Sequence, residues 1–237
     1  ITHDELVKLM VGREITEMFP KEEAEITDVK LEVSGLNVDG VLKDIHFKVH
    51  KGEILGFVGL MGAGRTEVME TLFGIRRASS GTVKIDGQKV SIHSPKDAIK
   101  HKIAFLTEDR RTTGCFLPLS VRDNIMVCSY DQISNKMKKI SEGKEKEVCG
   151  RQIEKYAIKT PGPEQAVGNL SGGNQQKVLI SRWLLTNPEI IILDEPTRGI
   201  DVGSKSEIHK MISQLARQGV AVVMISSELP EILGMSD

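Results

Sequence analysis

Residues 59–67, GLMGAGRTE, have the glycine spacing of a loop that binds a phosphate group. Glycines let such a loop turn tightly and point several backbone N–H groups at one anion. Thr66 is placed to ligate Mg²⁺, and a helix beginning near Arg65 would add the positive end of its dipole. The template has lysine at the position of Arg65, so a glycine-rich turn without a ligand is the alternative. The residues that fill the template are Gly59, Gly62, Ala63, Gly64, Arg65 and Thr66.

A second candidate group lies at residues 190–196, IIILDEP, where an apolar run ends in two acids. Asp194 can hold Mg²⁺ through water, and Glu195 can polarise an attacking water as a general base. An acidic turn at a strand end is common by itself and is the alternative. Because the phosphate-type loop and the acidic pair occur in one chain in this order, together they favour a nucleotide-hydrolysing site.

Periodicity indicates which elements position these groups. Residues 190–195 and 220–226 are short apolar runs rich in β-branched side chains, which is typical of buried parallel strands. Between them lies a helix pattern that ends near Gly219. Its apolar positions, spaced i, i+3, i+4 and i+7, are Ile208, Met211, Ile212 and Leu215. A strand, a helix and a strand in this order predict a parallel α/β sheet.

The rest of the chain shows other patterns. Alternating residues from residue 26 onward predict further strands, and the DG pair at residues 86–87 predicts a hairpin turn between two of them. Residues 115–170 are more polar and predict helices inserted between two halves of the sheet. Residues 3–11 predict a short helix, followed by a charged linker that contains Pro20.

The composition argues against several classes of protein. Lys and Arg number 32 and Asp and Glu 33, so the net charge of −1 shows no basic excess typical of nucleic-acid binding. The three cysteines form no CxxC pair, which argues against a zinc knuckle or a disulfide frame and favours a reducing cytoplasm. No apolar run approaches the roughly 20 residues of a membrane span. We expect the chain to be a fragment of a longer protein.

The third and most specific motif is LSGGNQQK at residues 170–177. Ser171 is suited to the N-cap of a helix that continues through residues 178–185. Leucine, serine and two glycines followed by a glutamine pair are the signature of ABC-transporter ATPases, which the chain resembles over nearly its full length. Residues 197–201, TRGID, resemble the D-loop of that family, which implies that Asp201 lies at the seam between two paired domains.

The resemblance narrows to one branch of that family. Five segments are similar to the second half of the duplicated ATPases that energise monosaccharide import: GEILGFVGLMGAGRTE, EDRR, LSGGNQQK, LDEPTRGID and SSELPE. Three segments are most similar to the importers of galactose and methyl galactoside: TLFGI, RWLLTNPEI and EPTRGIDVGSK. The resemblance implies an α/β P-loop NTPase fold, with a RecA-like parallel sheet core, an antiparallel β subdomain and an inserted helical subdomain.

The same resemblance implies a division of the chain into four parts. Residues 1–25 are expected to form an inter-domain helix and linker. Residues 26–114 are expected to form the antiparallel β subdomain and the first part of the ATPase core. Residues 115–170 would be the helical subdomain. Residues 171–237 would be the second part of the core, expected to be truncated at its C-terminal end.

Cofactors and partners are implied by the family as well. Each ATP, with Mg²⁺, is held between the phosphate loop of one domain and the signature of another. Ser171, Gly172 and Gly173 would therefore bind an ATP held by the first nucleotide-binding domain of the same full-length chain. The further implied partners are a transmembrane sugar permease and, indirectly, a periplasmic or extracellular sugar-binding protein, but no nucleic acid. The expected location is peripheral, on the cytoplasmic face of a bacterial cell membrane.

This chain departs from the family pattern at four places. Glu108 stands where the family's Q-loop glutamine contacts Mg²⁺, and Ser227 stands where a switch histidine binds the terminal phosphate. Arg65 replaces the loop lysine, and no aromatic residue for stacking on adenine occurs between residues 20 and 46. We therefore expect a weakened phosphate half-site beside an intact signature. Its candidate catalytic residues are Glu195, Glu108 and Ser227, and its candidate metal ligands are Thr66, Asp194 and Glu108.

Two other functions stay open. One is an ABC ATPase of DNA repair or translation, although repair members carry long coiled-coil arms and no sustained heptad run occurs here. The other is a catalytically silent regulatory domain, although the intact LDE sequence argues against it. A further hypothesis places a permease helix against residues 108–121, with Phe116 and Leu117 as anchors. Packing of both side chains inside the helical subdomain is its alternative.

Overall fold

The computed structural model describes residues 18–60, 62–130, 134 and 140–237, and the helix expected over residues 3–11 lies outside them. Its strands form two sheets. The antiparallel sheet has the order β2-β1-β4-β5, with β1 Val29–Val38, β2 Leu42–His50, β4 Ser80–Ile85 and β5 Gln88–Val90. The parallel sheet has the order β3-β8-β7-β6, with β3 Ile54–Val58, β6 Ile103–Leu106, β7 Ile190–Asp194 and β8 Ala221–Ser226. The two apolar runs are therefore neighbouring parallel strands, as predicted.

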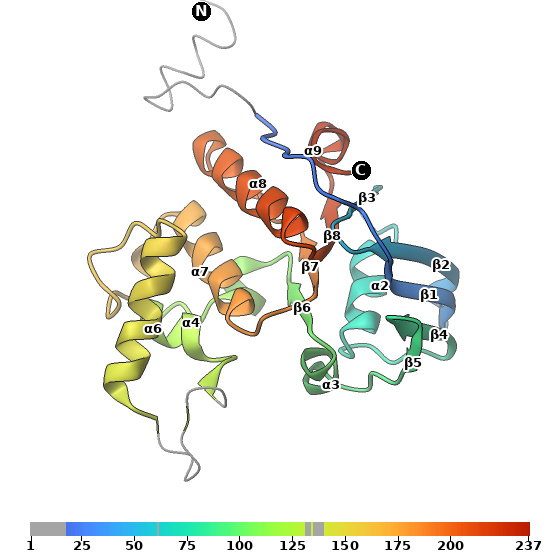
Figure 1. Ribbon diagram of the computed structural model, residues 1–237, viewed down its shortest axis with the longest axis horizontal. Helices are drawn as coiled ribbons and strands as arrows, with labels where there is room; N and C mark the ends of the chain where they lie inside the picture. Colours follow the sequence, from blue (N-terminus) through green and yellow to red (C-terminus); the bar gives the residue numbers. More distant parts are fainter. Residues whose placement is uncertain (1–17, 61, 131–133, 135–139) are drawn as a thin grey trace, which may run out of the picture.

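The helices divide into two groups on either side of the parallel sheet. In Figure 1, α4, α6 and α7 lie together on one side, and α2 lies on the other side beside the antiparallel sheet. The helix bounds are α2 Arg65–Leu72, α3 Pro95–Lys100, η1 Arg110–Gly114, α4 Val121–Met126, α6 Glu142–Lys155, η2 Val167–Asn169, α7 Gly172–Leu184, α8 Val202–Arg217 and α9 Leu229–Met235. None of the helices in the described ranges is long and apolar enough to span a bilayer.

The turn predicted at residues 86–87 joins β4 to β5. Asp86 has a φ of 48° and Gly87 a φ of 74°, so both lie in the left-handed region. Two such residues in succession make the type of turn whose twist matches a pair of antiparallel strands. Ile85 pairs with Gln88 directly across the turn, which confirms the predicted hairpin.

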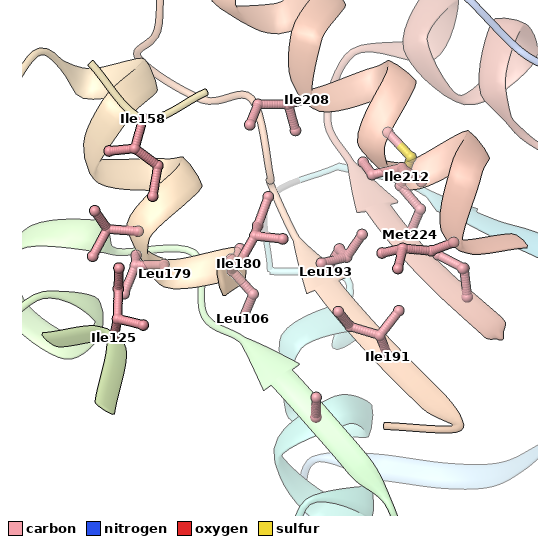
Figure 2. Close-up of a cluster of buried hydrophobic side chains, with 14 of the residues drawn as sticks. Leu106, Ile125, Ile158, Leu179, Ile180, Ile191, Leu193, Ile208, Ile212 and Met224 are labelled. Atoms are coloured by element: carbon pink, nitrogen blue, oxygen red, sulfur yellow. The ribbon is translucent and has the colours of Figure 1, made fainter. Parts of the chain in front are cut away.

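Strand β7 is buried on both faces, and this explains its uninterrupted apolar sequence. Ile191 and Leu193 belong to one core, shared with α7 and α8, whereas Ile190 and Ile192 belong to a second core, shared with α2 and the antiparallel sheet. The labelled members of the first core in Figure 2 are Leu106, Ile125, Ile158, Leu179, Ile180, Ile191, Leu193, Ile208, Ile212 and Met224. Because close packing fixes the strand, it also fixes Asp194 at its end.

Helix α8 follows the predicted apolar spacing. Ile208, Ile212 and Leu215 are buried, and Met211 packs at the margin of the same core. Gly219 follows the end of the helix with a φ of 86°, which suits glycine and confirms the predicted stop. The helix thereby anchors the D-loop segment that precedes it.

Candidate nucleotide site

Four segments meet at the edge where the parallel strands end. β3, β8, β7 and β6 are neighbours in this order, so the segments that follow them lie close together. They line a cavity of about 350 Å³. Its walls hold every residue predicted for the phosphate half-site except Gly59, and they consist of Gly62, Ala63, Gly64, Arg65, Thr66, Glu67, Glu108, Asp194, Glu195, Arg198 and Ser227. A larger depression of about 610 Å³, between the end of α2 and β4–β5, contains none of these residues.

The loop after β3 has the backbone shape that its glycines allow. Gly62 has a φ of 80° and Gly64 a φ of 83°, a region that other residues rarely adopt. A Cβ atom at Gly64 would lie 3.1 Å from Leu42 Cδ2, which makes that position tight as well. Helix α2 begins at Arg65, so its first N–H groups adjoin the loop, an arrangement that suits a phosphate.

Thr66 and Asp194 bring two oxygen atoms together at the base of the cavity. Thr66 Oγ1 donates a hydrogen bond to Asp194 Oδ2 over 2.7 Å. Burial raises the pKa of Asp194 to about 6, and the neighbouring charge of Glu195 raises it too, while the hydrogen bond from Thr66 lowers it. A cation placed beside this carboxylate would favour its charged form.

This pair fits a magnesium ion better than a metal held by the protein alone. The described residues contain no group of three His, Cys, Asp or Glu side chains that could hold a metal. Mg²⁺ commonly takes one or two protein oxygens and completes its shell with phosphate oxygens and water. A hydroxyl and a carboxylate beside a phosphate-type loop supply the protein's share of such a shell.

Glu195 is held between Arg65 and Ser227. Its φ of 49° is unusual for a residue other than glycine. Ser227 Oγ donates to Glu195 Oε2 over 3.1 Å, and Arg65 Nη1 lies 3.9 Å from Glu195 Oε1. The same Nη1 donates to the backbone oxygen of Ser226 over 3.0 Å. The guanidinium of Arg65 therefore has protein partners at the ends of β7 and β8.

Glu108 lies at the rim of the same cavity and forms an ion pair with Arg198 of the D-loop segment. Both side chains are substantially exposed. Glu108 was predicted as a metal ligand; the ion pair engages one of its two carboxylate oxygens, and the metal role stays a prediction.

The signature residues lie apart from this cavity, at the start of α7. Ser171 occupies the N-cap position as predicted, but its side chain makes no capping hydrogen bond. Its hydroxyl instead accepts a hydrogen bond from Asn174 Nδ2 over 2.8 Å. The expected cap is absent because Asn174, one turn along the same helix, competes for that oxygen. The Ser171 side chain is exposed and lies at the protein surface.

Both signature glycines allow close approach of other segments. A Cβ atom at Gly173 would lie 2.3 Å from Ser204 Oγ, so no side chain fits there. A Cβ atom at Gly172 would lie 3.0 Å from Arg110 Nη2 and 3.1 Å from the backbone oxygen of Gly199. These glycines therefore have a packing role in addition to the predicted role at the nucleotide.

Asp201 caps helix α8 next to the signature. Its Oδ1 accepts from the N–H of Ser204 over 2.9 Å, and its Oδ2 accepts from Ser204 Oγ over 2.7 Å. Burial alone would raise the pKa of Asp201, but these hydrogen bonds lower it below its ordinary value. The seam position implied for Asp201 stays a prediction, since its contacts here lie within the chain.

Sequence reasoning missed a buried polar group behind the D-loop. Thr197 Oγ1 donates to Glu231 Oε1 over 2.6 Å, and His209 Nε2 lies 2.5 Å from the same oxygen. All three side chains are almost fully buried. His209 Nδ1 also faces the backbone oxygen of Met18 at 3.1 Å. The available signal was His209, a polar residue at a core position of α8. Its partners come from two other segments, so the sequence pattern did not reveal them.

Comparison with known proteins places this chain in a family. The ABC transporter family model matches residues 42–198, so the chain belongs to the ABC transporter family. Its ATP-binding cassette fold is also found in a solved nucleotide-free cassette of an ABC transporter, at a TM-score of 0.77 and 20% identity over 89% of this chain and 86% of that one. A solved cassette in its ADP conformation gives a TM-score of 0.73 at 22% identity, with coverage of 89% and 86%. The predicted fold class is confirmed.

The chain is more similar in sequence to several import proteins. It is 56% identical to a putative ribose/galactose/methyl galactoside import ATP-binding protein 2 of Agrobacterium fabrum, over 100% of this chain and 46% of the relative. It is 55% identical to a putative ribose/galactose/methyl galactoside import ATP-binding protein of Hahella chejuensis, with the same coverage. The chain thus spans about half the length of these relatives, and the predicted resemblance is confirmed.

Proposed function

We propose that this chain is the second nucleotide-binding domain of an ABC importer that couples ATP hydrolysis to uptake of a monosaccharide, with galactose or methyl galactoside as the sugar. The names of the relatives support the sugar class, and the coverage of 46% supports one half of a duplicated protein. The observation that carries the ATPase assignment is the hydrogen bond between Thr66 and Asp194 at the base of a glycine-lined cavity.

The partners follow from this role. The first nucleotide-binding domain would precede this chain in the full-length protein, and the pair would attach to a transmembrane permease on the cytoplasmic face of the membrane. A sugar-binding protein would act through the permease. The division into linker, β subdomain, helical subdomain and core, with boundaries at residues 25, 114 and 170, belongs to the same proposal.

The chain's own phosphate half-site should hold nucleotide but turn it over slowly. The glycine loop and the start of α2 would bind phosphate, and Thr66 and Asp194 would supply oxygens to Mg²⁺, which when bound neutralises phosphate charge. Glu195 would accept the proton of an attacking water. Its carboxylate is held by Ser227 and lies close to Arg65, and Ser227 itself occupies the position directly after β8 that a histidine would need to contact the terminal phosphate. These contacts support slow turnover at this half-site.

The signature half is proposed to serve the other nucleotide. Ser171 and the N–H groups at Gly172 and Gly173 lie at the start of α7, where a helix dipole and several donors favour a phosphate. An ATP held by the first domain would present its terminal phosphate there. The strong composite site of the importer would therefore combine the first domain's loop with this chain's signature.

Reconstitution of the full-length protein with its permease and sugar-binding protein in proteoliposomes tests this proposal. ATP turnover should rise when galactose is supplied to the binding protein, and it should rise less with ribose or xylose as comparators. An ATP turnover rate that is unchanged by each of the three sugars would contradict the import function.

A catalytically silent regulatory domain is the second candidate, and the contacts of Glu195 with Ser227 and Arg65 favour it. Glu195→Gln in the full-length protein separates the two functions. Unchanged turnover in that variant would support the silent domain, whereas reduced turnover would support a slow second site.

A further inference from the structure

Arg110 joins three segments that are distant in the sequence. It begins η1, in the EDRR segment after β6. Its Nε donates to Gln175 Oε1 on the signature helix over 3.1 Å, and its Nη1 donates to the backbone oxygen of Arg198 in the D-loop segment over 3.3 Å. Its Nη2 lies beside Gly172, 3.0 Å from where a Cβ atom would stand. One guanidinium thus contacts the signature helix α7, the signature turn at residues 171–173 and the D-loop segment.

Gln175 also binds the chain segment that precedes the signature. Its Nε2 donates to the backbone oxygen of Val167 over 3.2 Å and to that of Leu170 over 3.1 Å. Both amide protons therefore have acceptors, and this leaves Oε1 to face Arg110. Because Gln175 is buried, loss of Arg110 would leave that oxygen without its donor.

The charge of Arg110 has no carboxylate partner in the described part of the chain. Glu108 pairs with Arg198, and Asp109 Oδ1 accepts from the N–H groups of Arg111 and Thr112. Burial lowers the pKa of Arg110 below its ordinary value, yet an arginine stays charged at neutral pH. A positive charge thus remains beside Gly172, next to the turn that would meet a phosphate.

We propose that Arg110 is a positioning residue of the composite site, which holds the signature turn against the D-loop segment and adds positive charge where the partner domain's ATP presents its terminal phosphate. This inference rests on the proposed function for that ATP, but its structural part concerns contacts within this chain. Arg110 acts through Gln175 and through the backbone of Arg198. Its effect should appear when the two domains close on ATP.

The matched variants are Arg110→Gln, Arg110→Lys and Arg77→Gln, all made in the full-length protein assembled with its permease. Glutamine at residue 110 removes the charge and the fork, whereas lysine keeps the charge but cannot reach both acceptors. Arg77 is an exposed arginine after α2, outside the nucleotide cavity and outside residues 108–121, and no side-chain hydrogen bond or ion pair of it is found within the described ranges.

Steady-state kinetics give the first readout. Arg110→Gln should lower kcat for ATP about tenfold and change KM less than about threefold, because the contact matters most in the closed, reacting state. Arg110→Lys should fall between Arg110→Gln and the wild type, and Arg77→Gln should match the wild type. A purely structural role would lower the amount of assembled protein and leave kcat per assembled complex unchanged.

Amide hydrogen exchange at residues 170–175 of the same proteins gives a readout that is independent of activity. Exchange there should be about tenfold faster in Arg110→Gln than in Arg77→Gln. Unchanged exchange together with unchanged kcat in Arg110→Gln overturns the inference. If the wild type shows no ATP turnover but Arg110→Gln still speeds exchange, the proposed function fails while the positioning contact stands.

Discussion

Thr66 and Asp194 are joined by a hydrogen bond of 2.7 Å that links the first turn of α2 to the end of β7. It directly connects the two motifs that are expected to share one site, the phosphate-type loop and the acidic strand end. Asp194 is 1% exposed, so its carboxylate depends on this hydroxyl and on any cation that binds beside it. We therefore expect the same pair to affect both the free energy of unfolding without Mg²⁺ and the affinity for Mg-ATP.

Thr66→Val tests this link. The substitution keeps the shape of the side chain but removes the donor to Asp194, so the free energy of unfolding without Mg²⁺ should fall by about 1–2 kcal/mol. Affinity for Mg-ATP should fall about tenfold, since one ligand oxygen is lost. Urea denaturation in EDTA and calorimetric titration with Mg-ATP measure the two effects. Thr66→Ser keeps the hydroxyl and should behave as the wild type; equal Mg-ATP affinity in the valine variant would refute the role.

The two half-sites should respond unequally to substitution. Ser171→Glu places a negative charge at the signature, where the proposed ATP presents its phosphate, and should lower sugar uptake more than tenfold, roughly the effect of losing one well-placed donor. Arg65→Ala should lower uptake less than about threefold, because the guanidinium already binds Ser226 and faces Glu195. Uptake and ATP turnover per assembled transporter are the measurements.

Ser171 is a better test position than Gly173. A side chain at Gly173 would overlap Ser204, so any substitution there mixes misfolding with loss of phosphate binding. Ser171 is exposed, and Ser171→Ala serves as its control, which removes the hydroxyl without adding charge. Arg65→Lys is the control for the loop. A larger loss from Arg65→Ala than from Ser171→Glu would show that the strong and weak halves are assigned the wrong way round.

Local sequence patterns predicted those parts of the fold that depend on near neighbours. β7, β8 and α8 were predicted from apolar periodicity, and the hairpin from the pair at residues 86–87. The phosphate loop and acidic pair were expected to share one site, and the order of the parallel strands brings them to one cavity. Their chemical roles stay predictions.

Side-chain directions could not be predicted, since they depend on distant partners. Arg65 binds the backbone of Ser226, which lies 161 positions away, and Arg110 binds Gln175 across 65 positions. No periodicity carries that information. Ser171 occupies the predicted N-cap position of α7, but its side chain does not make a capping hydrogen bond. Its hydroxyl oxygen accepts a hydrogen bond from Asn174 instead, which competes with capping.

Glu231 should make the stability of the chain depend on pH. Burial alone would raise the pKa of Glu231, but hydrogen bonds from His209 and Thr197 lower it below its ordinary value of 4.5. A carboxylate whose pKa is lower in the folded than in the unfolded chain stabilises the fold fully above its ordinary pKa. This stabilisation is lost as the pH falls through the lowered pKa of the folded chain. Glu231→Gln should therefore lower the free energy of unfolding by about 1–3 kcal/mol at pH 7. The difference in unfolding free energy between Glu231→Gln and the wild type should become smaller below pH 4.5.

Urea denaturation between about pH 2.5 and pH 8, a range that extends about two pH units below the carboxylate's ordinary pKa of 4.5, measures this difference in unfolding free energy. Glu228→Gln is the matched control, because Glu228 precedes the same helix but pairs with Lys205 at the surface, where ion pairs contribute little. It should show a loss of less than about 0.5 kcal/mol at any pH. A gap for Glu231→Gln that is the same at both ends of the range would contradict the assigned charge.

The two candidate permease anchors, Phe116 and Leu117, have different surroundings. Phe116 is 49% exposed, and its ring centroid lies 5.4 Å from the guanidinium of Arg182. Leu117 instead packs against the main core, as the alternative to the two-anchor hypothesis stated. Arg182 also lines a cavity of about 180 Å³ beside the exposed Ile75. Phe116 is therefore the remaining candidate anchor for a permease helix.

Phe116→Ala and Leu117→Ala should then differ in kind. Phe116→Ala should lower the free energy of unfolding by less than about 1 kcal/mol, the size of an exposed cation–π contact, yet it should lower sugar uptake more than about threefold because the permease loses an anchor. Leu117→Ala should cost about 2 kcal/mol of stability through lost packing, with uptake per folded transporter unchanged. Ile26→Ala, which shortens an exposed apolar side chain elsewhere, controls for general surface effects. Denaturation of the chain and uptake by the assembled transporter separate the two classes, and full uptake by a normally folded Phe116→Ala protein would remove the anchor.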